Sequence, residues 1–482
     1  MLRLSQVSLI FACGTALLSD GYSNSIIGNV VTVLQTQFGD DVIDTNRSTI
    51  LRSLTFAGTV LGMLTFGYLS DKVGRKFGML TATGIIALFS FLSACSQGAH
   101  DSKTGLVAML SAFRFLIGIG IGAEYPCGSV AASEQSEEEG IAKHSQHRWV
   151  ALATNTMIDF GFVIGAFVPL VLLWIFGENH LDAVWRGSLG FGLLPALVVF
   201  IWRLRMEEPT RYKKDSMKHA KIPYLLIIKR YWVRLAAISI VWFLYDFITY
   251  PFGLYSSTII NSIVPPGSSL TIVLGWATVI NLFYIPGTLI GAFVVDYLGA
   301  KYTLISGLLL QALFGFFMSG FYPELKHHVA GFAIMYGIFL SWGEFGPGNC
   351  TILIAAKAGP TAIRGQFYGM AAAIGKIGAF VGTWAFPPMI KAFGGSASDK
   401  GNSGPFFVGS GFAILSALIT FFFIKPISTD GMIKEDAEFR AYLEANGYDT
   451  SQMGLKDELV TNSSRDSVDE AEKGSDVLVS KL

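Results

Sequence analysis

Two long apolar stretches of this 482-residue chain each contain a carboxylate near the middle. Asp20 lies in LLSDGYSN, and Asp246 lies in VWFLYDFITYPFG. A charged side chain at the centre of a membrane costs roughly 2.5–3.5 kcal/mol by insertion scales, so we expect both carboxylates to line a polar cavity. Desolvation favours the protonated form of a carboxylate, which suits such groups to bind and release protons. Five further charged residues lie within apolar stretches, namely Arg114, Glu124, Asp159, Glu344 and Lys376.

Structural pairing is the alternative for any one of these charged residues. Arg114 precedes Glu124 by ten residues, or about 15 Å along a helix, so direct contact between them is not expected. Two roles for Arg114 stay open: it sets the protonation of another carboxylate such as Asp20, or it holds helices together. A shared cavity is the favoured interpretation of the whole set. The predicted proton-coupling residues are Asp20, Asp246, Glu124 and Arg114.

Several other chemistries lack their residues in this sequence. It contains no G-x-x-x-x-G-K-[ST] motif for a nucleotide, and no nucleophile is paired with a base. The seven histidines lie in loops or at the ends of apolar stretches, and the four cysteines have no paired spacing. We therefore predict that the protein is not an enzyme, has no metal site and no cofactor, and binds neither nucleotide nor nucleic acid. Protons are the predicted coupling ion.

The composition predicts the helices that must position these groups. Hydrophobic residues make up 52% of the chain and charged residues only 15%, which is typical of a protein that crosses a membrane many times. The predicted fold is therefore that of an all-α polytopic membrane protein. With about 20 apolar residues per crossing, twelve transmembrane helices are expected, centred near residues 20, 60, 88, 118, 162, 193, 248, 283, 310, 340, 378 and 414.

The distribution of positive charge predicts which loops face the cytosol. Ten Lys or Arg residues lie from Arg203 to Arg234, and DKVGRKF after the second apolar stretch adds three more. By the positive-inside rule, this places both chain termini in the cytosol. The first apolar stretch has no small-residue cleavage site, so it is predicted to be a first crossing and not a signal peptide. The final Ser-Lys-Leu is interpreted as a coincidence and not as a peroxisomal address.

An internal repeat divides the chain into two halves. GYLSDKVGRK at 67–76 is matched 225 positions later by AFVVDYLGAK at 292–301. Asp20 and Asp246 are 226 positions apart, and Glu124 and Glu344 are 220 positions apart. Such a repeat predicts two six-helix bundles around a shared axis, with Asp20 and Asp246 at equivalent depths. The predicted parts are a first bundle at 1–202, a basic cytosolic linker at 203–231, a second bundle at 232–426 and a cytosolic, largely disordered tail at 427–482.

Two short segments of the sequence resemble patterns of the major facilitator superfamily. GYLSDKVGRK resembles its loop motif, and RFLIGIGIGAEYP resembles the arginine and glycine pattern of its fourth helix. The resemblance implies twelve transmembrane helices in two pseudo-symmetric bundles. In this loop, Asp71, Arg75 and Lys76 are predicted to gate transport, because charge contacts at helix ends would stabilise the state that is open to the outside.

Longer segments resemble the fungal glycerophosphodiester (glycerophosphoinositol) permeases, which are similar in turn to phosphate:proton symporters. The segments are RFLIGIGIGAEYPCGSVAASE, EFGPGNCTILIAAKAGPTAIRGQFYG and AAAIGKIGAF. The resemblance implies a central site built from acidic residues of the first and fourth helices, a W-x3-D-x3-Y motif of the seventh, an Asn of the tenth and a Lys of the eleventh. The matching residues are Asp20, Glu124 with Tyr125, Trp242 with Asp246 and Tyr250, Asn349, and Lys376.

The chemistry of these residues agrees with a phosphate-binding site. Trp242, Asp246 and Tyr250 are spaced at i, i+4 and i+8, so they share one helical face. Lys376 and nearby hydroxyl groups are suited to replace the hydration of a phosphate anion, and the indole is suited to pack the organic part. The predicted substrate-binding residues are Tyr125, Trp242, Tyr250, Lys376, Asn349, Glu344 and Asp159.

The resemblance implies a proton-coupled importer of glycerophosphoinositol or glycerophosphocholine in the plasma membrane. Its partners are then an anionic phosphodiester and the lipid bilayer. The residues Cys127, Gly128 and Ser129, shortly after Tyr125, are small where phosphate symporters have bulkier ones, and this favours a larger diester. An inorganic phosphate:proton symporter stays an alternative because the W-x3-D-x3-Y motif and the lysine suit it as well. A nutrient sensor that binds without transporting is an alternative of another class.

Overall fold

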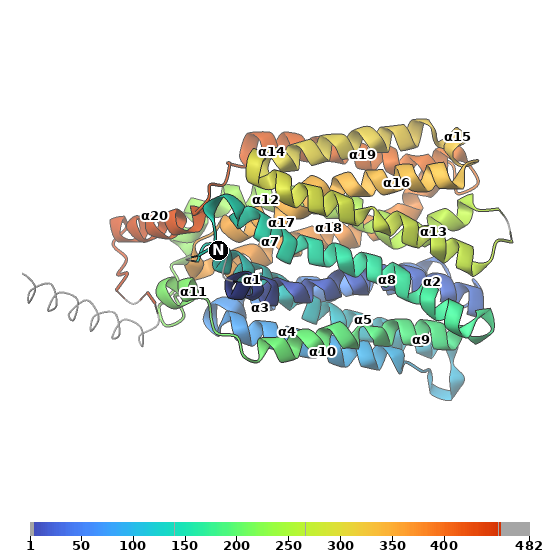
Figure 1. The fold of residues 1–482 in the computed structure, drawn as a ribbon, viewed down its shortest axis with the longest axis horizontal. Coiled ribbons are helices and arrows are strands. Elements are labelled where there is room, and N and C mark those ends of the chain that lie inside the picture. The colour runs from blue at the N-terminus through green and yellow to red at the C-terminus, as the bar shows by residue number, and fades with distance from the viewer. Residues whose placement is uncertain (1–3, 139, 266, 452, 455–482) are drawn as a thin grey trace, which may run out of the picture.

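The computed structural model describes residues 4–138, 140–265, 267–451 and 453–454. All regular structure in this part of the chain is helical, and no β-strand occurs in it. The long helices lie side by side along the long axis of the molecule (Figure 1). A helix satisfies its own backbone hydrogen bonds within the hydrocarbon region, which is why an apolar chain of this kind folds into helices. The predicted all-α class is confirmed.

The first half contains six crossings, several of which consist of two consecutive helices. The first crossing joins α1 (Leu4–Gly14) to α2 (Leu18–Phe38) through one 3-10 turn. The other helices of this half are α3 (Thr45–Lys72), α4 (Arg75–Ala94), α5 (Lys103–Glu124) with α6 (Val130–Ser136), α7 (Gln146–Ala153) with α8 (Asn155–Phe176), and α9 (Leu181–Phe191) with α10 (Leu193–Arg203).

The second half begins with α12 (Tyr224–Ile263), which carries the W-x3-D-x3-Y motif. A short helix of the connecting segment, α11 (Thr210–Asp215), precedes it, and α20 (Gly431–Ala445) follows the last crossing. The remaining helices are α13 (Leu270–Leu282), α14 (Tyr284–Gly320), α15 (Tyr322–Leu325), α16 (Val329–Gly343) with α17 (Asn349–Lys357), α18 (Arg364–Ala392) and α19 (Asp399–Phe423).

Ten helical segments are long and apolar enough to cross a membrane by length and composition. Residues 4–38 are not among the ten, although they form the first crossing of the bundle. The segment Leu270–Gly320 counts once among the ten but crosses twice, because the chain turns at Gly299. The φ of Gly299 is +75°, a conformation that glycine adopts without steric cost. Within the described residues, the helices therefore make the twelve predicted crossings.

The two halves repeat unusual local features at the offset that the sequence predicts. Gly74 and Gly299 both have positive φ and turn the chain at matching positions of the two loop motifs. One-turn π-helices at Tyr125–Ser129 and Glu344–Gly348 interrupt the fourth and tenth crossings. Such π-turns occur frequently at functional sites. The internal repeat of the sequence is thus matched by a repeat of backbone geometry.

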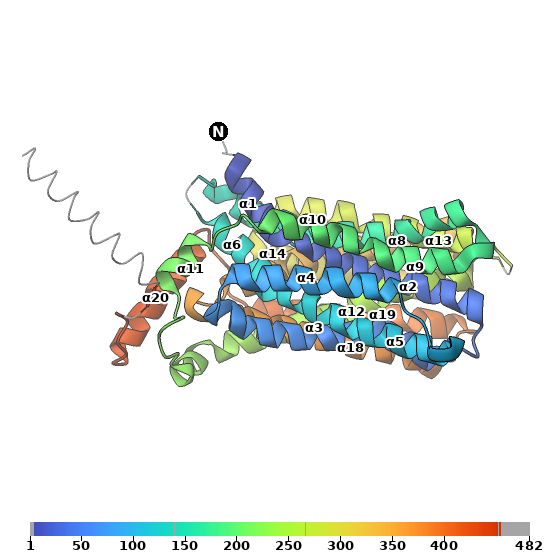
Figure 2. The same cartoon turned by 90° about the horizontal axis from the view of Figure 1, so that it is seen from below.

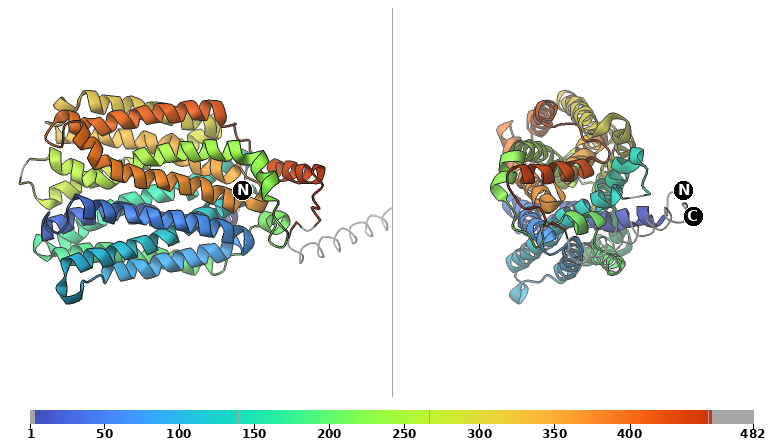
Figure 3. Two further views of the ribbon diagram at one scale, coloured as in Figure 1. Left: turned by 180° about the vertical axis from the view of Figure 1, so that it is seen from behind. Right: turned by 90° about the vertical axis from the view of Figure 1, so that its left-hand side faces the viewer.

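The two halves pack against each other mainly through α3 with α18, and also through α8 with α13, α7 with α14 and α2 with α12. The N-terminus, α11 and α20 lie at one end of the bundle, which we call the linker end (Figure 2). The short helix α15 lies at the other end, which we call the opposite end (Figure 1). Seen along the long axis, α20 runs across the linker end of the bundle (Figure 3, right).

The tail differs from the predicted disorder over Gly431–Ala445, which forms α20. Met432, Phe439 and Leu443 are buried on one face of this helix, and burial of that apolar face explains why it docks. Residues 452 and 455–482 of the predicted tail lie outside the described residues. The connection between the halves runs at 204–223, because α12 already begins at Tyr224, within the predicted linker.

Candidate functional site

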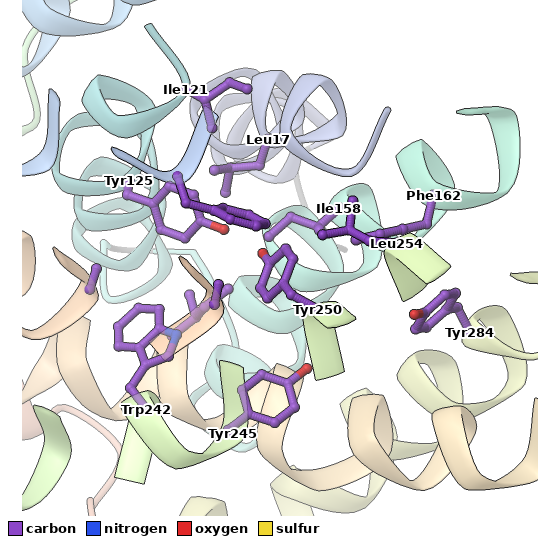
Figure 4. Packing of buried hydrophobic residues seen from close by; sticks show 14 of the residues in the cluster. Leu17, Ile121, Tyr125, Ile158, Phe162, Trp242, Tyr245, Tyr250, Leu254 and Tyr284 are labelled. Carbon is purple, nitrogen blue, oxygen red and sulfur yellow. The ribbon is translucent and has the colours of Figure 1, made fainter. Parts of the chain in front are cut away.

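A cavity of about 20 Å³ lies where helices of the two halves meet. This volume holds about one water molecule, so the centre of the bundle is occluded. Aromatic side chains surround it, and Figure 4 shows Tyr125, Trp242, Tyr245 and Tyr250 converging on this region. Its polar lining comes from α8, α12, α17, α18 and both π-turns. The polar and aromatic lining residues are Tyr125, Asn155, Asp159, Phe162, Trp242, Tyr245, Asp246, Thr249, Tyr250, Glu344, Thr351 and Lys376.

Lys376 lies between the two carboxylates that the sequence places in equivalent crossings. Its Nζ is 3.7 Å from Asp20 Oδ2 and 3.5 Å from Asp246 Oδ2. All three side chains are about 1% exposed. The Nζ also donates a hydrogen bond to the Tyr250 hydroxyl and lies 5.0 Å from the ring centroid of Tyr125. One cation thus compensates two buried carboxylates, one from each half.

Asp20 receives hydrogen bonds from both halves of the protein. Asn24, one turn further along α2, donates to Asp20 Oδ1 at 2.6 Å. The Tyr125 hydroxyl donates to Asp20 Oδ2, and the Tyr250 hydroxyl donates to the same oxygen at 3.3 Å. Because Tyr250 belongs to the second half, the charge on Asp20 affects contacts that join the halves.

A second acidic pair, Asp159 and Glu344, lines the same cavity. The side-chain amide of Asn155 donates to Asp159 Oδ2 and to Glu344 Oε2, both at 3.1 Å. The Tyr245 hydroxyl donates to Glu344 Oε1 at 2.8 Å. Asn155 was not among the predicted site residues, although its spacing of i, i+4 from Asp159 places the two side chains on one helical face. Tyr245, beside Asp246 on α12, was likewise absent from the predicted site.

Trp242 occupies its place because Gly375 on α18 leaves room for it. A Cβ at Gly375 would lie 2.6 Å from Trp242 Cδ1, so a larger residue there would displace the indole. The ring packs edge-on against Tyr368, with centroids 5.6 Å apart. The indole lines the cavity as predicted from its helical face.

Glu124 does not line the cavity, in contrast to Tyr125 next to it. Successive residues of a helix point in directions about 100° apart, so only one of the two can face the cavity. Glu124 instead pairs with Arg203 of α10, with Oε1 2.6 Å from Nη1, and both side chains are buried. Arg203 also donates to the backbone carbonyls of Ala12 and Cys13. Arg203 is the first residue of the basic linker predicted from the sequence, so its pairing with Glu124 was not predicted.

Arg114 and Asn349 also lie outside the cavity lining. Arg114 Nη1 donates to Ser23 Oγ at 2.7 Å, and no ion pair of Arg114 is found in the described chain. The side-chain amide of Asn349 donates to the Thr288 carbonyl at 2.9 Å and so joins α17 to α14. Asn349 therefore supports helix packing next to the site.

Charged residues close the linker end between the two halves. Asp71 pairs with Arg75 at 2.6 Å, and Arg75 pairs with Glu134 at 3.2 Å. Glu134 also pairs with Arg364 at the start of α18, at 3.0 Å. Asp71 accepts hydrogen bonds of 2.9 Å from the backbone N–H groups of Gly365 and Gln366, as expected for a carboxylate at a helix N-terminus. Lys76 takes part through its backbone N–H, which donates to Glu208.

The same arrangement recurs in the other direction between the halves. Asp296, the repeat partner of Asp71, accepts a hydrogen bond of 3.1 Å from the backbone N–H of Arg148 on α7. Each half thus caps a helix of the other with its loop carboxylate. The docked helix α20 adds Asp436, which accepts from the Thr361 hydroxyl at 2.7 Å and lies 3.5 Å from Arg364. Burial raises the pKa of the Asp436 carboxyl, and Arg364 opposes that shift.

A much larger cavity, of about 830 Å³, opens at the opposite end. We call it the vestibule and define it by Arg52, Tyr255, Trp384 and Lys391, which are among its lining residues. The Arg52 guanidinium lies 4.5 Å from the ring centroid of Tyr255 and donates to Thr258. The structure is therefore closed at the linker end, occluded at the centre and open at the opposite end.

Arg364→Ala is expected to shift the protein away from this state. The change removes a guanidinium from buried Glu134 and Asp436, and breaking a buried pair costs about 3–5 kcal/mol. The linker end should open and the vestibule should close. The alkylation rate of a cysteine placed at Ser262, an exposed residue of the vestibule, should then fall at least about tenfold. A Cys95→Ser background suits this measurement, since the other three cysteines are buried.

The control for that measurement is Lys434→Ala on α20. Lys434 pairs with Glu438 at 3.8 Å, and both side chains are about half exposed or more. Exposed pairs contribute about 0–1 kcal/mol, so the alkylation rate should stay nearly unchanged. An equal rate in the Arg364→Ala variant and the control would show that the charge network does not hold the linker end closed.

The description "Sugar (and other) transporter" belongs to a protein-family model that matches residues 7–221 and 211–437, nearly the whole described chain. The chain belongs to this transporter family. It is 46% identical to the glycerophosphocholine permease GIT4 of Candida albicans over 92% of this chain and 83% of that protein. It is 43% identical to the major glycerophosphoinositol permease GIT3 of the same organism, over 92% and 83% of the two chains.

A solved structure of the proton:xylose symporter XylE, of the major facilitator superfamily, shares the fold of this transporter. The TM-score is 0.72 at 17% identity, over 90% of this chain and 98% of XylE. The predicted fold of that superfamily is confirmed by this likeness and by the family match. The similar proteins are membrane transporters, which confirms that this family member is a multi-pass transporter and not an enzyme.

Proposed function

We propose that this transporter imports glycerophosphodiesters together with protons across the plasma membrane, by alternating access. The observation that carries the proposal is Lys376, the only cation among the described residues that line the central cavity, held between Asp20 and Asp246. The permease names of the relatives GIT4 and GIT3 support the class of substrate. The basic linker end is the cytosolic side in this proposal, so that the vestibule faces outward.

The phosphate group of the substrate binds at Lys376. The ammonium group and the hydroxyls of Tyr125 and Tyr250 already form one hydrogen-bonded set around Asp20, and they supply the donors that a phosphate needs. Trp242 packs against the organic part. The cavity must widen for this, and the vestibule is the route by which the substrate reaches it from outside.

Proton coupling follows from the charge of the cavity. Four carboxylates, on Asp20, Asp246, Asp159 and Glu344, line it or contact its lysine, and Lys376 is the only cation among the described residues of the lining. An anionic phosphodiester adds further negative charge in a medium of low dielectric, where repulsion is strong. Protons on Asp20 and Asp246 remove that repulsion, so that the substrate and the proton enter the site together. Both then leave at the linker end, once its charge network has opened.

Glu124 has a different place in this scheme from the one that the sequence predicts. Its pairing with Arg203 keeps it away from the cavity and neutralises it. We therefore assign proton coupling to Asp20 and Asp246, with Glu124 and Arg203 holding α5 against α10 and the first crossing. No metal or other cofactor has a part in the proposal.

Uptake into cells that express the wild type or Asp246→Asn tests this proposal. Radiolabelled glycerophosphoinositol and glycerophosphocholine serve as substrates at acidic and neutral pH, with inorganic phosphate as competitor. We expect acid-stimulated uptake of a diester that the variant lacks and that phosphate inhibits weakly. Asp399→Asn is the matched control, because Asp399 pairs with Lys326 at the opposite end, outside the cavity.

Two other results would contradict the proposal. Strong inhibition by phosphate, with transport of phosphate itself, would favour the phosphate:proton symporter. That candidate has its own support, since the lysine and the two tyrosine hydroxyls suit any phosphate group. Binding of a diester without uptake, by protein shown to be at the cell surface, would favour a sensor.

A further inference from the structure

The acidic pair Asp159 and Glu344 has no cation in direct contact with it among the described residues. Neither carboxylate forms an ion pair within the described part of the chain, whereas Asp20 and Asp246 share Lys376. Their only shared partner is the neutral amide of Asn155. The Asp159 side chain is 1% exposed and Glu344 is 3% exposed, so water does not solvate the pair. Ionised carboxylates that are buried without a cation are strongly unfavourable, so either a proton or a bound cation must offset the charge of this pair.

One oxygen of the pair has no partner at all. Asp159 Oδ1 is buried and accepts no hydrogen bond from any described residue. Asp159 lines the central cavity, so this oxygen belongs to the wall that a substrate would face. Buried polar groups in native proteins are nearly always paired, and an orphaned acceptor at a cavity wall points to a ligand that is absent from this state.

Aromatic rings stand beside the acidic pair. Phe162 lines the cavity one turn after Asp159, and its ring centroid is 6.1 Å from that of Tyr250 and 5.0 Å from that of Tyr284. Tyr245 completes this side through its hydrogen bond to Glu344. Figure 4 shows Phe162 and Tyr284 on the side of the site away from Tyr125, with Tyr250 between them and Tyr125. Carboxylates combined with aromatic faces are the environment that recognises ammonium groups, including quaternary ones with no N–H to donate.

The positive charge of the site and its unpaired acidic groups therefore lie in different places. The ammonium of Lys376 lies between Asp20 and Asp246, and it forms no ion pair with either Asp159 or Glu344 in the described chain. A zwitterionic ligand with a phosphate at one end and an ammonium group at the other would satisfy Lys376 and the acidic pair at once. A ligand with a neutral headgroup would satisfy only the lysine and would leave the acidic pair to hydrogen bonds.

We infer that Asp159 and Glu344 form a subsite for the cationic headgroup of a zwitterionic glycerophosphodiester, whose phosphate binds Lys376. The inference rests on the proposed function and extends it, because it names the class of headgroup that the protein prefers. Glycerophosphocholine carries such a headgroup, and glycerophosphoinositol carries a neutral one. The expected preference is for the choline diester.

Glu344→Gln and Asp159→Asn test this inference, with uptake of the two diesters measured in parallel. Each variant removes one negative charge and keeps the shape of the side chain. We expect the KM for glycerophosphocholine to rise on the order of 10- to 100-fold, the effect of losing an interaction with a charged group. The KM for glycerophosphoinositol should not rise, because its neutral headgroup loses no charge partner and the removed carboxylate repels its phosphate, and this uptake also reports that the variant is folded. Asp399→Asn should leave both values unchanged.

An equal reduction in the uptake of both diesters, together with a shifted pH profile of uptake, would show that the pair is a proton site and would overturn the inference. Unchanged KM values for both would overturn it as well. If neither variant reaches the cell surface, competition in the wild type decides. Unlabelled glycerophosphocholine should then inhibit uptake of labelled glycerophosphoinositol about tenfold more strongly than unlabelled glycerophosphoglycerol, which has a neutral headgroup, and equal inhibition would refute the subsite.

The wild type separates this inference from the proposed function. Uptake of glycerophosphoinositol with no preference for the choline diester would leave the function standing and remove the cationic subsite. A wild type that takes up no diester would overturn both.

Discussion

Asp20→Asn is expected to abolish the accumulation of substrate that a pH gradient drives, while exchange of substrate across the membrane continues at a measurable rate. The asparagine side chain keeps the size of the carboxyl group but cannot bind and release a proton. Asp20 accepts hydrogen bonds from both halves, from Tyr125 and Tyr250, and also shares Lys376 with Asp246, so its charge is well placed to link protonation to the movement of the halves.

The size of the effect follows from the free energy of a proton gradient. One pH unit corresponds to 1.36 kcal/mol, so each coupled proton supports about tenfold accumulation of substrate per pH unit. The steady-state ratio of inner to outer substrate should rise by this factor in the wild type when the outside is made one unit more acidic. The variant should stay near a ratio of one at every pH.

Counterflow provides the second readout for Asp20→Asn. Vesicles loaded with unlabelled diester should still take up labelled diester, because binding and the movement of the halves do not require a net proton. Asp399→Asn, which removes a carboxylate at the opposite end, should behave as the wild type in both assays. Undiminished pH-driven accumulation in Asp20→Asn would transfer the coupling role to another carboxylate.

Lys376→Met is expected to reduce uptake of every phosphodiester by at least about 100-fold. The change removes the only cation among the described lining residues, and an anionic substrate would then face carboxylates alone. A hydrogen bond to a charged group contributes about 1.5–3 kcal/mol, or roughly 10- to 150-fold in binding. Loss of the compensation between Asp20 and Asp246 adds to that effect. Initial rates of uptake at acidic pH measure it.

A matched double variant distinguishes loss of binding from loss of folding. Lys376→Met leaves Asp20 and Asp246 without their cation, and removing one partner from a buried pair costs about 3–5 kcal/mol of stability. Adding Asp246→Asn removes one of the two charges, so thermal stability in detergent should recover in part. Uptake should stay absent, because the lysine is still missing. Recovery of uptake along with stability would show that Lys376 is structural and does not bind the phosphate.

Features that depend on local spacing could be predicted from the sequence alone. The twelve crossings follow from the lengths of the apolar stretches, and the turn at Gly299 follows from the repeat of the loop motif around Gly74. The common face of Trp242, Asp246 and Tyr250 follows from the helical period alone. Equivalent depths for Asp20 and Asp246 follow from the repeat, and both carboxylates do reach Lys376.

Which face of each helix contacts which neighbour depends on the tertiary structure and could not be predicted from the sequence. Glu124 and Tyr125 are adjacent in the sequence, yet the rotation of α5 directs the tyrosine to the cavity and the glutamate to Arg203. The acidic pair of Asp159 and Glu344 is likewise invisible in the sequence, because its members come from different halves and share Asn155 only after the halves pack. Helical periodicity constrains directions within one helix, whereas contacts between helices depend on the rotation and depth of every helix in the bundle, and these are set by packing of the whole chain.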